Sequence, residues 1–305
     1  MVNKINQSSS KLSIINNQSS IIRVVFFGSS RYVLPVIEVL NKNFNLFLVV
    51  TTEKQPTDPL IAYCKSKSIP TVSVSSSENL SSIINRQLSL LKASLGVIAD
   101  FGIIIPKSLI QAFPEAIINI HPSLLPKYRG PTPVQTAILQ GDQKTGVTII
   151  KIDEEVDHGP ILYQEEMDIL PEDTSETMLV KLFQKGANSL SKTISGYIKG
   201  SIIPTEQIHS NATFTHLLKK QDGYIDLSIV NNRSSIININ RMIRAFYPWP
   251  GVWTLFRLSS KGQAKVIKLL PDGKVQVEGK RPMSYGDFIN GYEKGEEFLK
   301  KVGLL

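Results

Sequence analysis

Short apolar runs alternate with amphipathic stretches along the first part of the chain. The runs occupy residues 21–28 (IIRVVFFG), 46–52 (LFLVVTT), 71–74 (TVSV), 95–100 (LGVIAD) and 117–121 (IINIH). Strands that are apolar on both faces are typical of a parallel sheet covered by helices on both sides. The intervening stretches, such as YVLPVIEVL and NLSSIINRQLSLL, have helical spacing. This alternation predicts an α/β fold with an open, mostly parallel, Rossmann-like sheet.

The pattern changes after the fifth run. Residues 146–153 and 161–169 are strand-like and separated only by a short acidic turn, which predicts a hairpin. A long helix is expected to follow, beginning near Asp173 with Glu176 three residues later. The polar, proline-containing segment after Gly200 then indicates a domain boundary.

The last third of the chain is a different kind of segment. Residues 201–305 hold 15 Lys or Arg against 9 Asp or Glu, and residues 1–200 hold 19 against 17. Strand-like pieces at 252–258, 264–270 and 274–279 predict a smaller, basic, β-barrel-like domain of the OB type, shortened between Phe256 and Met283. Such a domain is suited to nucleic-acid binding, although a solvated basic surface explains the charge equally well.

The expected organisation has four parts. A polar, disordered tail covers residues 1–20, a catalytic domain residues 21–205, a linker residues 206–221, and the basic β domain residues 222–305. No apolar run has the length of a membrane span, so no membrane partner is expected. One cysteine, Cys64, excludes an intrachain disulfide, and the four scattered histidines show no zinc spacing. A cytoplasmic protein is therefore expected, and we expect it to be a monomer.

Candidate chemistry lies between Ile117 and Gly159. Asn119 and His121 are two residues apart at the end of an apolar strand, so both side chains leave the same face. A stiff, proline-rich loop follows at 122–133, and the acidic turn at 153–159 carries Asp157. By position alone, a strand-end histidine and a turn aspartate also have ordinary structural explanations. The single glycine of FFGSSRY is not a dinucleotide-binding fingerprint.

The combination of these motifs resembles the folate-dependent formyltransferases, in particular their tRNA-formylating branch. The resemblance runs from about Ile21 to at least Leu227 and resumes at Ile243. The matching residues are Asn119-Ile120-His121, Ser123-Leu124-Leu125-Pro126, Arg129-Gly130, Gly146-Val147-Thr148, Asp157, Gly159, Arg244-Ala245-Phe246-Tyr247-Pro248-Trp249-Pro250-Gly251, and the terminal segment 279–292.

This resemblance implies transfer of a formyl group from 10-formyltetrahydrofolate to the α-amino group of methionine on initiator tRNA, a step of translation initiation. Asn119 and His121 would stabilise the oxyanion of the tetrahedral intermediate. Asp157 would orient the imidazole and help move the proton lost by the amine. No metal is implied.

The same resemblance assigns the folate site and the tRNA site. Ser123, Leu124, Leu125 and Pro126 would line the folate site, and Ala99, Phe101, Gly102 and Asp153 would border the pteridine. The basic C-terminal domain would hold the tRNA. Trp249 and Trp253 are interpreted as packing residues rather than as platforms for bases.

Two other functions remain open. Pro122 after His121 and the short segment after the second strand favour a small amine acceptor, either glycinamide ribonucleotide or an amino-sugar nucleotide. The basic, shortened C-terminal domain also fits a non-catalytic RNA-binding relative.

Overall fold

The computed structural model describes residues 22–82 and 93–305. The polar tail predicted for residues 1–20 lies outside the described residues, and so does much of the amphipathic stretch NLSSIINRQLSLL. Within the described ranges, no helix has the length and apolar character needed to span a bilayer.

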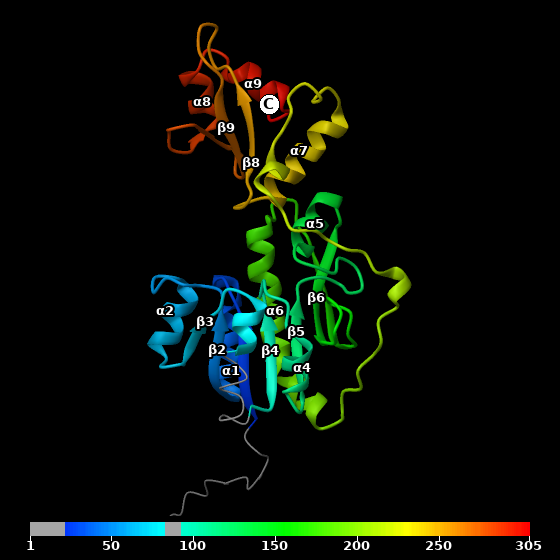
Figure 1. Ribbon diagram of the computed structural model, residues 1–305. Helices are drawn as coiled ribbons and strands as arrows, with labels where there is room; N and C mark the ends of the chain where they lie inside the picture. The colour runs from blue at the N-terminus through cyan, green and yellow to red at the C-terminus, as the bar shows by residue number, and fades with distance from the viewer. Residues whose placement is uncertain (1–21, 83–92) are drawn as a thin grey trace, which may run out of the picture.

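The described residues of the N-terminal domain form a seven-stranded sheet in the order β3-β2-β1-β4-β5-β6-β7 (Figure 1). Strands β1 to β5 are mutually parallel, whereas β6 runs antiparallel to β5 and β7 antiparallel to β6. The predicted open, mostly parallel α/β sheet and its hairpin are confirmed. The strands are β1 (Arg23–Gly28), β2 (Asn45–Thr51), β3 (Thr71–Ser73), β4 (Leu95–Ala99), β5 (Ala116–His121), β6 (Lys144–Lys151) and β7 (Ile161–Asp168).

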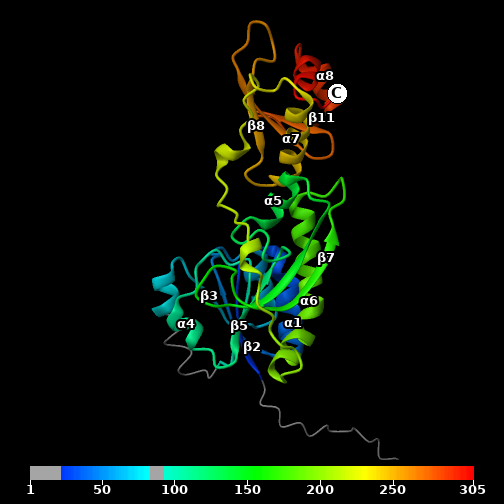
Figure 2. The same cartoon turned by 90° about the vertical axis from the view of Figure 1, so that its right-hand side faces the viewer.

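Helices cover both faces of this sheet, as Figure 2 shows for α1 (Leu34–Asn43) and α6 (Ser175–Ile198) on one side and α4 (Lys107–Gln111) on the other. Strand β5 divides its side chains between the two faces. Ile118 and Ile120 belong to the core cluster that includes α6, whereas Ile117 belongs to the opposite cluster with α4. Because side chains alternate along a strand, Asn119 and His121 project on the α4 side.

The helix expected from Asp173 begins two residues later. Thr174 is its N-cap, and Thr174 and Thr177 form the reciprocal capping bonds, so the expected pairing of Asp173 with Glu176 is wrong. Asp173 instead accepts hydrogen bonds from Thr177 Oγ1 at 2.8 Å and Lys181 Nζ at 2.6 Å. Threonine is also a preferred N-cap residue, and the Asp173 carboxylate is instead engaged by Thr177 and Lys181 in the first two turns.

The segment after α6 runs back along the N-terminal domain before it reaches the C-terminal one (Figure 1). Thr205 pairs with Ile161 of β7, and Arg129 pairs with Phe214. The short helices η2 (His209–Asn211) and η3 (Lys220–Gly223) lie within this segment. The connection between the domains is therefore hydrogen-bonded to the sheet domain over much of its length.

The C-terminal domain contains a four-stranded antiparallel sheet in the order β11-β10-β9-β8, which confirms a separate small β domain. Trp253 packs on Tyr224 with ring centroids 4.8 Å apart, as expected, but Trp249 is 56% exposed. The elements of the C-terminal domain are α7 (Arg233–Ala245), β8 (Val252–Phe256), β9 (Lys265–Leu270), β10 (Lys274–Val277), β11 (Met283–Ser284), α8 (Tyr285–Gly291) and α9 (Gly295–Lys301).

Contacts between the domains form around the start of α6. Ser175 Oγ donates to the Ala245 carbonyl at 2.5 Å, and Arg244 Nη1 donates to the Asp173 carbonyl at 2.9 Å. Helix α7 also packs on α5 (Pro133–Gln140) of the N-terminal domain. These bonds tie the RAFYPWPG segment directly to the long helix.

Candidate active site

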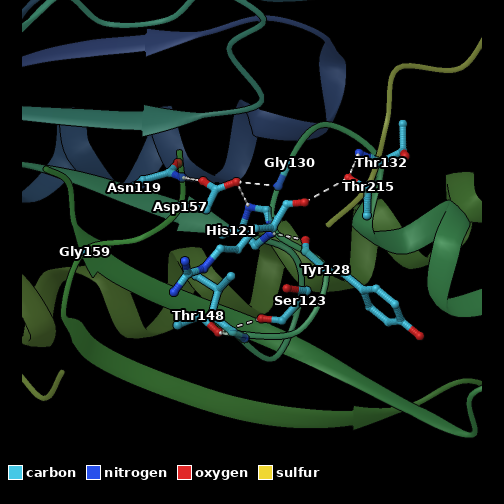
Figure 3. A network of polar contacts seen from close by, with 12 residues as sticks. Asn119, His121, Ser123, Tyr128, Gly130, Thr132, Thr148, Asp157, Gly159 and Thr215 are labelled. Carbon is cyan, nitrogen blue, oxygen red and sulfur yellow. Dashed lines mark hydrogen bonds and ion pairs between the residues drawn. The ribbon is translucent and has the colours of Figure 1, made fainter. Parts of the chain in front are cut away.

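Strand β5 delivers Asn119 and His121 to one face of the sheet. In the antiparallel pairing with β6, Asn119 lies opposite Ile150 and His121 opposite Thr148. His121 is buried and Asn119 half-buried. The loop after β5 and the turn between β6 and β7 meet over this face, so side chains distant in sequence come together there (Figure 3).

Asp157 joins these elements through its carboxylate. Its Oδ1 accepts a hydrogen bond from Asn119 Nδ2 at 3.1 Å, and its Oδ2 accepts one from the Gly130 backbone N–H at 2.8 Å. The same Oδ2 lies 3.5 Å from His121 Nδ1, and the carboxylate side chain is only 11% exposed. Asp157 has a φ of +51°, a left-handed conformation that is uncommon outside glycine. Tertiary contacts therefore fix the turn in a conformation that aims this carboxylate at its partners.

The imidazole of His121 is held on both sides. Its Nε2 lies 3.0 Å from the Tyr128 carbonyl oxygen, which can only accept, so Nε2 carries a proton. Its Nδ1 faces Asp157. Neither ring nitrogen is free to face an oxyanion in this conformation, which differs from the expected role of His121. By contrast, the second amide hydrogen of Asn119 has no hydrogen-bond partner among the described residues.

The Ser123–Pro126 loop is anchored by strands β6 and β7. The Thr148 hydroxyl donates to the Ser123 carbonyl at 2.6 Å and accepts from the Leu125 N–H at 3.1 Å. Gln164 Nε2 donates to both the Leu125 carbonyl and the Thr148 hydroxyl, each at 2.9 Å. These bonds satisfy the buried polar groups of the loop and hold it beside His121.

Gly146 lets the same loop approach strand β6. A Cβ atom at Gly146 would lie 2.4 Å from Leu124 Cδ2 and 2.3 Å from the Glu165 carbonyl oxygen. Only glycine therefore fits beneath Leu124, which explains why Gly146 and the SLLP loop occur together.

The other predicted folate contacts lie on neighbouring elements. Ala99 ends β4, the strand beside β5, and Phe101 packs on Phe27 with ring centroids 5.8 Å apart. Gly102 is exposed, and no atom within 4 Å would meet a Cβ there. Asp153 begins the turn that carries Asp157, and its carboxylate pairs with His158 Nδ1 at 2.6 Å. Across the described residues, no side-chain hydrogen bond links residues 99–102 to Asn119, His121 or Asp157.

One further carboxylate stands at the end of β4. Protein atoms surround the Asp100 carboxyl although the residue is exposed at the rim, and this desolvation raises its pKa. Ser30 Oγ donates to Asp100 Oδ2 at 2.5 Å, which opposes the rise, and Glu53 adds to it. Residues 22–82 and 93–305 contain no group of three His, Cys, Asp or Glu side chains placed to hold a metal ion.

Several residues that build this site carry no signal in the sequence. Tyr128 contributes a backbone carbonyl to the site, and any residue type could do so. Gln164 is an exposed polar residue in the regular alternation of β7. Neither residue therefore forms part of a motif. Gln207 lies in the polar segment before the C-terminal domain, 50 residues from the carbonyl that it contacts. Only contacts in three dimensions distinguish these residues from ordinary surface ones.

Comparison with family models gives two matches along the chain. Residues 22–194 match the model described as formyl transferase. Residues 218–274 match the model described as formyl transferase, C-terminal domain. The two matches cover the sheet domain with its candidate site and most of the smaller domain.

Curated relatives are similar over most of the chain. A methionyl-tRNA formyltransferase of Koribacter versatilis is 34% identical over 319 residues, covering 92% of this chain and 99% of that protein. A methionyl-tRNA formyltransferase of Roseiflexus sp. is 35% identical over 246 residues, covering 77% of this chain and 74% of that protein.

Solved structures share the fold. A 4-N formyltransferase from Francisella tularensis superimposes with a TM-score of 0.63 at 20% identity, covering 83% of this chain and 98% of that one. A phosphoribosylglycinamide formyltransferase from Bacillus halodurans superimposes with a TM-score of 0.52 at 28% identity, covering 59% of this chain and 96% of that one.

Proposed function

Because the chain belongs to the formyl transferase family, we propose that it transfers the formyl group of 10-formyltetrahydrofolate to the α-amino group of methionine on initiator tRNA. The observation that carries the proposal is the half-buried Asp157 carboxylate, which accepts hydrogen bonds from the N–H groups of Asn119 and Gly130 beside His121. The acceptor is inferred from the named relatives, whose similarity extends through the C-terminal domain.

Asn119 donates a hydrogen bond to the oxyanion in this mechanism. The amine attacks the formyl carbon, and the carbonyl oxygen becomes an oxyanion. One amide hydrogen of Asn119 is held by Asp157, which fixes the orientation of the other. A preorganised donor costs no reorganisation when the charge develops and is typically worth about 3–4 kcal/mol.

His121 and Asp157 hold the proton. The attacking nitrogen forms a bond to the formyl carbon and must lose a proton, while the bond from that carbon to N10 of the folate breaks and N10 gains one. His121 Nε2 already donates to Tyr128, so an incoming proton is held at Nδ1 against the Asp157 carboxylate, directly or through a water. Contacts of this kind shorten when the reactants bind, which suits the present 3.5 Å separation.

The folate donor would lie against the loop after β5. Ser123, Leu124, Leu125 and Pro126 would line its site, with the anchoring by Thr148 keeping the loop rigid. Ala99, Phe101, Gly102 and Asp153 would border the pteridine, where backbone groups can read its hydrogen-bonding edge. In this proposal residues 21–205 form the catalytic domain.

The C-terminal domain, residues 222–305, would hold the tRNA. Its excess of Lys and Arg supports binding to phosphates, and such binding weakens as salt is added. Residues 206–221 link it to the catalytic domain. The contacts of Ser175 and Arg244 with the opposite domain support a fixed placement of the tRNA relative to the site.

Two observations favour a small amine as acceptor. Only residues 52–58 join β2 to α2 (Pro59–Ser66), where the tRNA-formylating branch usually has a longer basic loop. Pro122 beside the catalytic histidine points the same way. The catalytic steps at Asn119, His121 and Asp157 are the same for either acceptor.

A single assay tests both acceptors. Formyl transfer from 10-formyltetrahydrofolate is measured with methionine-charged initiator tRNA, charged elongator tRNA, glycinamide ribonucleotide, an amino-sugar nucleotide, and no acceptor. Transfer confined to charged initiator tRNA is expected. Transfer to a small amine without tRNA would replace the proposed acceptor, and no transfer to any of them would overturn the proposed function.

A further inference from the structure

Gln207 is a buried residue in the segment that links the two domains. It is 5% exposed, whereas its neighbours Glu206 and Ile208 are exposed. Both ends of its side-chain amide are fully used. Oε1 accepts from Arg129 Nε at 3.2 Å and Nη2 at 2.8 Å, and Nε2 donates to the backbone carbonyls of Asp157 at 2.9 Å and Gly159 at 2.7 Å.

These contacts close a ring around Asp157. On one side, the Asp157 carboxylate accepts the Gly130 N–H. On the other side, Gln207 binds the Asp157 carbonyl and the side chain of Arg129, the residue before Gly130. The turn and the loop are thus locked to each other both at the catalytic carboxylate and behind it.

The turn needs such a lock for two reasons. Asp157 adopts a φ of +51°, and a non-glycine residue retains that conformation only when its surroundings hold it there. Gly159 lies so close to β6 that a Cβ would come within 1.9 Å of the Lys151 carbonyl oxygen. Gln207 donates hydrogen bonds to the backbone carbonyls of Asp157 and Gly159. These bonds hold the backbone of the turn and thereby the orientation of the Asp157 side chain.

The loop is held by the same linking segment. The Arg129 N–H donates to the Thr213 carbonyl at 2.8 Å, and the Arg129 carbonyl accepts from the Thr215 N–H at 2.8 Å. Arg129 itself is 3% exposed, and its Nη2 also reaches His209 Nδ1 at 2.8 Å. The linking segment therefore forms one wall of the site as well as connecting the domains.

We propose that Gln207 is a positioning residue for formyl transfer, acting through the backbone of Asp157 rather than by touching either substrate. This inference rests on the proposed function. It makes this residue of the interdomain segment part of the catalytic machinery. Losing the Gln207 contacts would misalign Asp157 with Asn119 and His121, whereas Thr148 and Gln164 would still anchor the Ser123–Pro126 loop. A purely structural alternative is that Gln207 only satisfies the hydrogen-bond donors of the buried Arg129 side chain.

Two variants separate these explanations. Gln207→Met has a similar length but binds neither Arg129 nor the two carbonyls. Gln207→Glu retains and strengthens the contact with Arg129, but it presents a carboxylate oxygen to the Asp157 and Gly159 carbonyls in place of an N–H donor. Glu206→Gln, at the exposed neighbouring position, is the matched control. The full-length proteins are compared for melting temperature and for kcat and KM in formyl transfer.

We expect kcat to fall by about 10- to 100-fold in both Gln207 variants, with the KM for 10-formyltetrahydrofolate nearly unchanged. The melting temperature of Gln207→Glu is expected to lie above that of Gln207→Met, and Glu206→Gln to match the wild type. A wild-type kcat in Gln207→Glu would overturn the inference, because it would show that Arg129 alone needs Gln207. Should Gln207→Met not fold, Gln207→Glu alone decides. A wild-type protein without formyl transfer would instead overturn the proposed function, and the inference with it.

Discussion

The Nε2 atom of His121 lies 3.0 Å from the backbone carbonyl oxygen of Tyr128. Because a carbonyl only accepts, this contact fixes one proton of the imidazole and turns the other ring nitrogen toward Asp157. The Asp157 carboxylate that faces this nitrogen is itself held by hydrogen bonds from Asn119 and Gly130. In the proposed mechanism, Nδ1 is therefore the atom at which His121 receives a proton.

Asp157→Asn should lower kcat by at least about 100-fold. The asparagine oxygen can accept from Asn119 or from Gly130 but not from both, since its other terminal atom is an N–H donor. It also removes the negative charge beside His121. Single-turnover transfer at saturating donor measures the effect, with circular dichroism as the test of folding. Turnover within about threefold of the wild type would contradict the assigned role.

His121→Ala should have an effect of similar size, at least about 100-fold on kcat, because the proton-holding atom is lost. The matched control is His216→Ala. His216 is exposed, and within the described residues only its backbone carbonyl is hydrogen-bonded, to Thr132 Oγ1. That variant should retain wild-type kcat in the same assay. Equal losses in the two variants would point to a general effect of removing histidines rather than to catalysis by His121.

The sheet could be predicted well because each strand is specified by a short, continuous stretch of sequence. Apolar runs such as 21–28 are long enough, and alternate regularly enough with helical stretches, to specify buried parallel strands. The hairpin and the small β domain were recognisable for the same reason. The predicted start of α6 was wrong because Asp173, Thr174 and Ser175 are all suitable N-cap residues. The hydrogen bonds that their side chains form, which the sequence does not reveal, make Thr174 the N-cap.

The site was predictable only in part. Asn119 and His121 share one strand, so their common face followed from their spacing. Asp157 and Asn119 are 38 residues apart in the sequence, and Gln207 and Asp157 are 50 residues apart. No local sequence pattern predicts contacts between residues so far apart along the chain. The use of both His121 nitrogens depends on a backbone carbonyl, which has no sequence signature.

Two threonines of β6 give a matched test of the loop anchor. Thr148→Val should raise the KM for the folate donor more than it lowers kcat, and should destabilise the fold by about 1–3 kcal/mol. The destabilisation follows because the buried Ser123 carbonyl and Leu125 N–H lose their hydrogen-bond partner, and the Gln164 amide loses one of its two. Thr145→Val removes a buried hydroxyl that has no partner in the described part of the chain, so it should be neutral or slightly stabilising. Urea unfolding and steady-state kinetics compare them, and equal effects would refute the anchoring role.

Stability near the domain junction should depend on pH through Asp173. Burial raises the pKa of Asp173, but hydrogen bonds from Lys181, the Leu170 N–H and Thr177 outweigh it and hold the pKa below its ordinary 3.8. A carboxyl with a lowered folded-state pKa stabilises the fold above its unfolded pKa and loses that contribution as the pH falls. The advantage of the wild type over Asp173→Asn should be about 2 kcal/mol and constant above about pH 5, then decline below it. Urea midpoints across this range measure it, and an advantage that grew on acidification would contradict the assignment.

The role of the C-terminal domain in tRNA binding can be tested by the salt dependence of KM. If the basic C-terminal domain binds tRNA phosphates, each contact releases counterions, and the KM for charged tRNA should rise at least about tenfold between about 50 and 200 mM NaCl. The KM for 10-formyltetrahydrofolate, measured in the same reactions, is the internal control and should change far less because the donor does not carry a polymer's condensed counterions. Parallel changes in both constants would indicate a general effect of salt on the catalytic domain. A tRNA KM that is insensitive to salt would contradict the proposal that the basic C-terminal domain binds the tRNA phosphates.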